Sequence, residues 1–122
     1  MVLIDGRPIF LQIAELLENS IIDGSLPEDT QVPSTNELAA FHRINPATAA
    51  KGINQLVADE ILHKKRGIGM FVSPGARDRL RARRQQEFAG QFVNPLIIEA
   101  RKLGIDLADL QDLVDRCWKE AR

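Results

Sequence analysis

The feature that most constrains the fold is a short predicted helix that stops and restarts within a few residues. Ser34 and Glu37 have the spacing of a capping box, in which each side chain accepts a hydrogen bond from the other residue's backbone N–H. A helix is therefore predicted over about 35–42. Asn45-Pro46 starts the next one, over about 46–59, because Asn is a good N-cap and Pro suits the first helical turn. Two helices joined by so short a turn predict a helix-turn-helix.

The flanking segments extend this motif on both sides. Between Pro8 and Gly24, apolar residues recur at helical spacing and predict a helix over about 8–23, followed by a loop over 25–32. After residue 60, two short predicted strands, 61–65 and 70–73, flank the glycine-containing turn Arg66-Gly67-Ile68-Gly69, which predicts a β-hairpin. Three helices followed by a hairpin form the order of a winged helix-turn-helix, assigned here to residues 1–75.

Residues 76–122 predict a second, helical module, so the fold class is mainly α with a small β-hairpin. Pro95 is expected to kink or interrupt its first helix. The apolar residues form two stripes, which exceed what two helices can hide between themselves. A second copy of the chain would cover the rest. The predicted dimer interface consists of Leu80, Phe88, Phe92, Leu96, Leu107, Leu110, Val114 and Trp118.

Composition excludes several classes of protein. The chain has 122 residues with 44% apolar, 27% charged and 5% aromatic residues, which are ordinary globular values. No apolar run approaches the roughly 20 residues of a membrane span, and the first residues lack the pattern of a signal peptide, so we expect a cytoplasmic protein without a membrane partner. The single cysteine, Cys117, excludes an internal disulfide framework. The sequence predicts no metal and no cofactor. It also lacks the phosphate-loop, HExxH and GxSxG motifs, so an enzyme is not indicated.

Charge is informative only locally, because the net charge is -1. The predicted hairpin tip, Lys64-Lys65-Arg66-Gly67, has three adjacent cations and a glycine that permits close approach of the backbone. In a helix-turn-helix the start of the second helix enters the major groove of DNA. Within the first turns of that helix Lys51 is the only cation. These two regions are the predicted contacts with double-stranded DNA.

Several motifs together resemble the GntR family of bacterial transcription regulators. They are Pro8-Ile9-Phe10-Leu11-Gln12-Ile13, Val32-Pro33-Ser34, Glu37-Leu38-Ala39 and Arg66-Gly67-Ile68-Gly69-Met70-Phe71-Val72. The short helical tail and Ile44-Asn45-Pro46-Ala47-Thr48 resemble its YtrA-like subfamily in particular. The order and spacing of these motifs make the match specific.

The resemblance implies a repressor-like homodimer that binds a pseudo-palindromic operator. It also implies which positions contact DNA. In this sequence they are Ser34, Thr35, Asn36, Asn45, Ala47, Thr48, Lys51, Lys64, Lys65, Arg66 and Gly67. The family often has Arg at position 36 and in the first turns of the second motif helix, so direct base readout is expected to be thinner here. Operator sequence, target genes and the existence of a small-molecule effector stay open.

Other interpretations remain beside these. Ser34 can be a helix cap without touching DNA, and the arginine-rich stretch 77–84 can be a solvated helix face or can support phosphate binding. A protein-interaction adaptor that has lost DNA binding is the alternative function. It is favoured by the nine acidic and six basic residues of 1–75, and the cationic hairpin tip argues against it.

Overall fold

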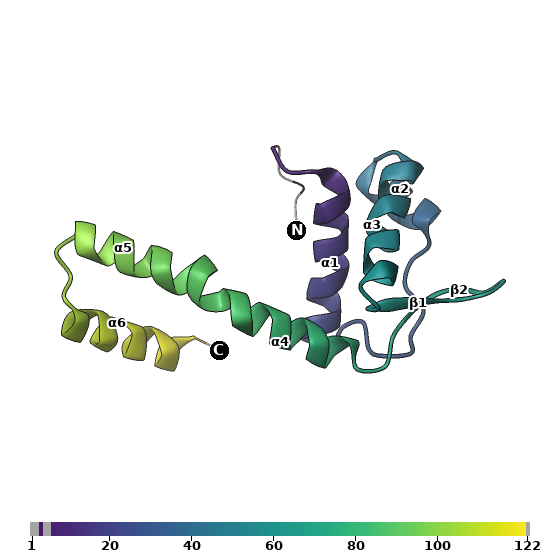
Figure 1. The fold of residues 1–122 in the computed structure, drawn as a ribbon. Coiled ribbons are helices and arrows are strands. Elements are labelled where there is room, and N and C mark those ends of the chain that lie inside the picture. The colour runs from purple at the N-terminus through teal and green to yellow at the C-terminus, as the bar shows by residue number, and fades with distance from the viewer. Residues whose placement is uncertain (1–2, 4–5, 122) are drawn as a thin grey trace. The chain divides into compact units, whose positions relative to one another are not determined.

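The computed structural model describes residue 3 and residues 6–121, and Figure 1 shows its helices and strands. Three helices come first: α1 (Ile9–Asp23), α2 (Thr35–His42) and α3 (Pro46–Ala58). An antiparallel hairpin of β1 (Leu62–Lys65) and β2 (Gly69–Val72) follows. The remaining elements are α4 (Ala76–Phe88), the π-helical η1 (Ala89–Val93), α5 (Asn94–Lys102) and α6 (Leu107–Glu120). The mainly α class with a small hairpin is confirmed.

The predicted caps define the ends of α2 and α3. The Ser34 Oγ accepts from the Glu37 N–H at 3.1 Å, and the Glu37 Oε1 accepts from the Ser34 N–H at 3.0 Å, which completes the capping box. Arg43 ends α2 in the left-handed region, with φ 54°. The Asn45 Oδ1 accepts from the Ala47 N–H at 2.8 Å and starts α3. Local chemistry therefore places the turn of the helix-turn-helix.

The chain divides into two compact units, Met1–Arg83 and Arg84–Arg122. The first unit has a core to which all three initial helices, the hairpin and the start of α4 contribute. Its largest fully buried side chains are Ile13, Ile21, Ile53, Leu56, Leu62, Val72 and Leu80. This core sets the spacing between α2, α3 and the hairpin.

Two predictions about α4 need correction. The first module is predicted to end at residue 75, whereas the units divide between Arg83 and Arg84, inside α4. Leu80, predicted at the dimer interface, has an exposed fraction of 0% and belongs to the core of the first unit, as does Ala76. The helical spacing of Leu80 with Phe88 suggested one stripe. That spacing does not show that Leu80 packs into the core of the first unit while Phe88 lies in the second unit.

The segment predicted as a loop over 25–32 forms backbone hydrogen bonds with β2 at its end. The Asp29 N–H donates to the Val72 carbonyl oxygen at 2.8 Å, and the Val32 N–H donates to that of Met70 at 2.9 Å. Between them, Gln31 forms an isolated antiparallel bridge with Phe71. The hairpin is thus fixed along the β2 edge by the chain that leads into α2.

The second unit contains the rest of α4 and the helices after it. Pro95 does not end the helix. A π-helical turn precedes it, in which the Asn94 N–H donates to the Ala89 carbonyl oxygen five residues back. This wider turn accommodates a residue that lacks an N–H and whose ring crowds the preceding turn. The Asp106 side chain then caps α6 by accepting from the Asp109 N–H at 2.9 Å.

Candidate nucleic-acid interface

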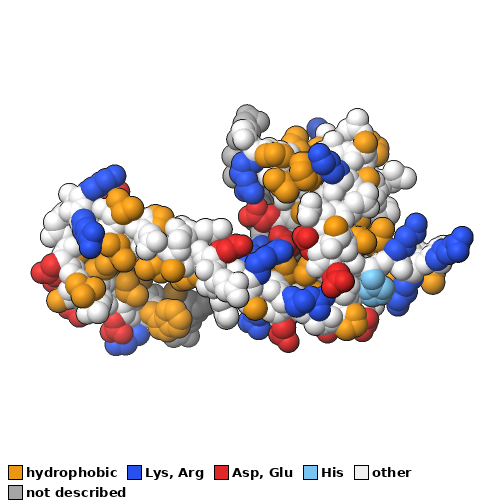
Figure 2. Space-filling view, in the orientation of Figure 1, with side chains coloured by type: hydrophobic (Ala, Val, Ile, Leu, Met, Phe, Trp, Pro, Cys, Tyr) orange, Lys and Arg blue, Asp and Glu red, His pale blue; other side chains and the backbone are white. Residues whose placement is uncertain are grey.

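The hairpin tip is a cluster of exposed cations. Lys64, Lys65 and Arg66 are all exposed, and Lys and Arg side chains gather at this end of the hairpin in Figure 2. Gly67 adopts φ +78° in the turn, a conformation that glycine adopts without strain, and the Ile68 N–H closes the turn onto the Lys65 carbonyl oxygen at 2.9 Å. Within the described part of the chain, no carboxylate lies at ion-pair distance from these three cations. Their charge is therefore available to an anionic partner.

The start of α3 presents a second group of predicted contacts. One face of this helix is buried, through Ala49, Gly52, Ile53 and Leu56. Asn45, Ala47 and Lys51 are exposed, and Thr48 is half-buried at the margin. Lys51 is the one cation on this helix, and its Nζ lies 4.1 Å from the centroid of the Phe10 ring in α1. The helix thus offers few direct base contacts from its first turns.

The start of α2 forms the third group, in which Ser34 and Asn36 are exposed and Thr35 is half-buried. The Ser34 backbone N–H, and next the Ser34 hydroxyl, hold the pKa of Glu37 below its usual value. Glu37 is therefore a charged cap at neutral pH, placed where the partial positive charge of the helix N-terminus favours it. The Ser34 hydroxyl oxygen accepts the Glu37 N–H within the cap.

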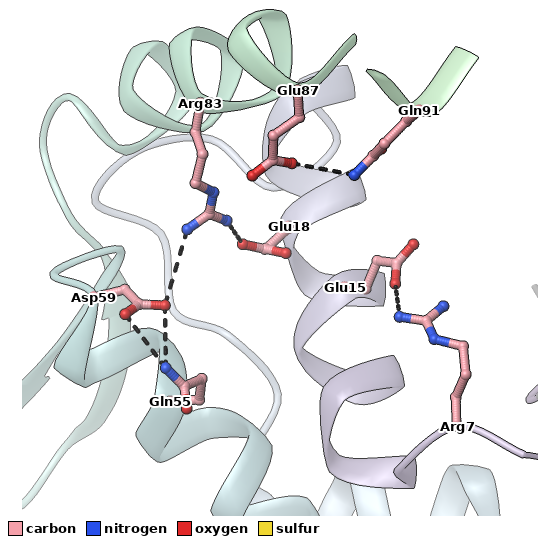
Figure 3. A network of polar contacts seen from close by, with 8 residues as sticks. All are labelled: Arg7, Glu15, Glu18, Gln55, Asp59, Arg83, Glu87 and Gln91. Carbon is pink, nitrogen blue, oxygen red and sulfur yellow. Dashed lines mark hydrogen bonds and ion pairs between the residues drawn. The ribbon is translucent and has the colours of Figure 1, made fainter. Parts of the chain in front are cut away.

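Arginines of α4 are used mainly within the first unit. Arg77 donates through Nε to the Ile22 carbonyl oxygen at 2.9 Å, and Arg79 donates to the Pro74 carbonyl oxygen at 3.1 Å. Arg83 contacts the carboxylates of Glu18 and Asp59 (Figure 3). These contacts join α4 to α1, to the end of α3 and to the exit of the hairpin. These structural contacts explain Arg77, Arg79 and Arg83 without a role in binding DNA phosphates.

In the second unit, the predicted interface residues other than Leu80 lie on or near an apolar surface. Phe92, Leu107 and Trp118 have exposed fractions of 61%, 69% and 81%. A groove of about 510 Å³ lies between α5 and α6 and is lined largely by apolar side chains. Its lining includes Leu96, Leu107, Leu110, Val114 and Trp118. Phe88 and Phe92 pack against each other with ring centroids 5.5 Å apart.

Two residues near the predicted contacts were missed by sequence reasoning. Arg43 is exposed in the turn between α2 and α3, where it is the C-cap of α2. Gln31 donates through Nε2 to the Ile68 carbonyl oxygen at 3.0 Å and so holds the turn of the hairpin. For Arg43, the signal was a cation two residues before Asn45-Pro46, in the turn. No local pattern links Gln31 to a turn 37 residues away.

The elements from α1 to β2 match those of a known protein family. The model of the family described as bacterial regulatory proteins, gntR family, matches residues 10–72, from α1 to the end of β2. The chain belongs to this family. It is 29% identical to the HTH-type transcriptional repressor YtrA of Bacillus subtilis (strain 168) over 117 residues, which cover 93% of this chain and 89% of the repressor.

Two solved structures extend the comparison to the fold. The crystal structure of a transcriptional regulator from Oenococcus oeni matches with a TM-score of 0.78 and 25% identity, over 97% of each chain. AraR(DBD) in complex with operator ORX1 matches with a TM-score of 0.56 and 29% identity, covering 60% of this chain and 95% of that one. The family, the winged helix-turn-helix fold and a DNA-binding regulatory function are thereby confirmed, and the adaptor alternative is not favoured.

The structure describes residue 3 and residues 6–121 of this gntR-family chain. In that part of the chain, no helix is both long and apolar enough to cross a bilayer. Nor do three or more His, Cys, Asp or Glu side chains there form a group suited to a metal ion. The relatives are transcription regulators rather than enzymes.

Proposed function

We propose that the chain is a repressor that binds a pseudo-palindromic DNA operator as a homodimer. The observation that carries this proposal is the set of exposed, carboxylate-free cations on the hairpin beside an exposed α3 start in a gntR-family fold. The name of the YtrA relative supports repression, and the AraR(DBD) complex supports an operator as the ligand. An operator as ligand supports a cytoplasmic location for the protein.

On the DNA, each part of the first unit has a different task. The start of α3 enters the major groove, where Asn45, Ala47, Thr48 and Lys51 meet base edges and the backbone. Lys64, Lys65 and Arg66 bind phosphate oxygens, with Gly67 permitting close approach. Ser34, Thr35 and Asn36 contact the backbone beside the α2 N-terminus, where unpaired N–H groups attract an anion.

The dimer forms through the second unit. Isolated winged helices bury little surface on DNA, whereas two tethered copies multiply their affinities through effective concentration. The apolar surface over α5 and α6, with Trp118 81% exposed, is covered by the same surface of a second copy. The exposed rings of Phe88 and Phe92 extend this surface along the chain toward α4.

Operator choice differs from that of relatives with arginine at position 36. Asn36 lacks the fork that reads two acceptors of guanine, and Lys51 is a single point charge. Base contacts are few, so DNA shape and the spacing of two half-sites contribute much of the discrimination. The operator therefore has to be found by experiment.

Selection of bound duplexes from a random DNA pool tests the proposal. Two inverted half-sites should be enriched, with centres about one helical turn, roughly 10–10.5 bp, or a multiple of it apart. Binding to the selected duplex should exceed binding to a scrambled one at the same salt concentration and should weaken as salt rises. Recovery of unenriched DNA, or equal affinity for both duplexes, would reject sequence-specific binding to an operator.

A further inference from the structure

Two of the cations assigned to DNA lie over aromatic rings. The Lys51 Nζ is 4.1 Å from the centroid of the Phe10 ring, and the Lys65 Nζ is 4.1 Å from that of Phe71. Both distances fall within the range of about 6 Å in which a ring face attracts an ammonium group. Neither lysine has a carboxylate partner within the described residues, so each ammonium is oriented without being neutralised.

The Phe71 ring is itself held in place. It is half-buried on β2, opposite His63 in the β1–β2 register, and the two rings stack with centroids 6.2 Å apart. Gln31 bridges Phe71 from the other edge of β2 and bonds to the Ile68 carbonyl oxygen. A Cβ on Gly69 would stand 2.5 Å from the Gln31 Nε2, so this close approach depends on a glycine there. The ring is thus a fixed platform on a hairpin of two four-residue strands.

Phe10 lies where α1 passes close to α3. It lies in the first turn of α1, is half-buried, and its carbonyl oxygen lies against Gly52 of α3, next to Lys51 in the sequence. Both lysines therefore share one arrangement, in which a flexible cation lies over the ring of a half-buried phenylalanine. A lysine side chain otherwise samples many rotamers and loses them on binding.

We propose that Phe71 and Phe10 are positioning residues that hold Lys65 and Lys51 ready for the phosphate oxygens of DNA. This inference rests on the proposed function and adds which residues preorganise its charges. The ring attracts the ammonium through its quadrupole and does not cancel its charge, so the N–H donors that point away from the ring remain free for phosphate. Preorganisation lowers the ordering cost of binding.

The hairpin supplies a matched control. Lys64 is paired with Met70 on the opposite face of the hairpin from Lys65, because successive side chains of a strand alternate between faces. No ring contact involves Lys64 within the described residues. Phe71 should therefore be coupled to Lys65 and independent of Lys64.

The cation–π contact between Lys65 and the Phe71 ring is tested in the absence of DNA. In the full-length protein, the methylene protons next to the Lys65 Nζ should show upfield NMR shifts from the Phe71 ring. These shifts should disappear in Phe71→Leu and persist in Phe71→Trp, while the Lys64 shifts stay unchanged. Unshifted Lys65 protons in the wild type would overturn the proposal.

Its role in binding is tested by double-mutant cycles on the selected operator, with folding of each variant checked by circular dichroism. Phe71→Leu should weaken binding about two- to fivefold, the range of an exposed cation–π contact, and Phe71→Trp should restore it. The loss should vanish in a Lys65→Ala background and remain in full in a Lys64→Ala background. Equal losses in both backgrounds would overturn the proposal.

Salt dependence separates this inference from the proposed function. Lys65→Ala should flatten the slope of log affinity against log salt by about one, whereas Phe71→Leu should leave the slope unchanged because the phosphate contact survives. If Lys65→Ala changes neither the affinity nor the salt slope, the proposed contact between the hairpin and DNA is rejected, and the Lys65–Phe71 contact has no role in binding. If Lys65→Ala acts as expected but the effects of Lys65→Ala and Phe71→Leu simply add, only the positioning role of Phe71 is rejected. The same double-mutant cycle with Phe10→Leu and Lys51→Ala tests the contact on α3.

Discussion

Gly52 of α3 lies directly against the backbone of Phe10 in α1. A Cβ at position 52 would stand 2.7 Å from the Phe10 carbonyl oxygen. It would also lie 3.2 Å from the Cβ and Cγ2 of Ile13, whose exposed fraction is 0%. The contact is too close for any side chain, so the crossing of α1 and α3 is built around a glycine.

Gly52→Ala should therefore destabilise the first unit, although alanine favours helices. The backbone oxygen cannot move as a side chain can, and overpacking costs about 1–3 kcal/mol. The effect is measured as a lower urea midpoint followed by circular dichroism. Asn54→Ala, on the exposed face of the same helix, serves as control and should change stability by less than about 0.5 kcal/mol. A stabilised Gly52→Ala protein would show that the two helices can separate without cost.

Replacing Lys64, Lys65 and Arg66 together by Ala should weaken binding to operator and to unrelated DNA alike. Phosphate contacts carry no sequence information, so specificity is retained while affinity falls. The salt slope should flatten by about one for each contact removed. Fluorescence anisotropy over a salt series measures both quantities. Unchanged affinity and slope at low salt would reject the hairpin as a DNA contact.

Leu80→Ala should destabilise the first unit by about 2–5 kcal/mol, because a fully buried leucine leaves a cavity when it is truncated. Because α3 and the hairpin share this core, the variant should lose DNA binding at a lower temperature than the wild-type protein does. Thermal unfolding measures the change, and Leu103→Ala in the second unit, where Leu103 is 67% exposed, is the comparison. If Leu80→Ala gave a stably folded monomer, the original assignment of Leu80 to the dimer interface would stand.

The sequence predicted those parts of the fold that local chemistry determines. The capping box at Ser34 and the Asn45 cap placed α2 and α3, and the cationic turn around Gly67 placed the hairpin. Family motifs that run from α1 to β2 reflect the same local constraints. Residue types that dictate their own backbone conformation are visible without any tertiary information.

Features that depend on distant partners could not be predicted in this way. The strand pairing of residue 31 with Phe71, the packing of Leu80 into the first unit and the contacts of Arg83 all join segments far apart in the chain. Helical periodicity shows that Leu80 has an apolar side, but it does not show which surface covers it. The cation–π contacts of Lys51 and Lys65 were missed for the same reason.

Acid should weaken the α2 cap through Glu37. Because hydrogen bonds from Ser34 lower the pKa of Glu37 in the folded state, the folded protein binds fewer protons than the unfolded chain as pH falls. The stabilisation is present above the ordinary pKa of the carboxyl group and is lost as pH drops through the lower pKa of the folded state. Glu37→Gln keeps an acceptor at the same place and does not titrate. The stability difference between the two proteins should shrink between neutral pH and pH 3. A difference that stays constant over this range would mean that the carboxylate charge adds nothing to the cap.

The dimer is tested by Phe88→Asp combined with Phe92→Asp. The two rings pack together at the start of the second unit, with exposed fractions of 52% and 61%, so little of the chain's own core depends on them. Buried carboxylates facing each other across a symmetric interface would cost far more than the apolar contact they replace, because both charges lose water without a partner. The protein should sediment as a monomer while its circular dichroism shows a folded first unit. Operator affinity should fall by orders of magnitude, since one winged helix no longer benefits from its tethered neighbour, and weak nonspecific binding should survive.

Gln85→Asp with Gln86→Asp adds the same charge on exposed polar positions of α4 and should stay dimeric. A double Phe variant that remains dimeric would place the interface on other residues, and one that unfolds globally would show that the two units depend on each other for stability.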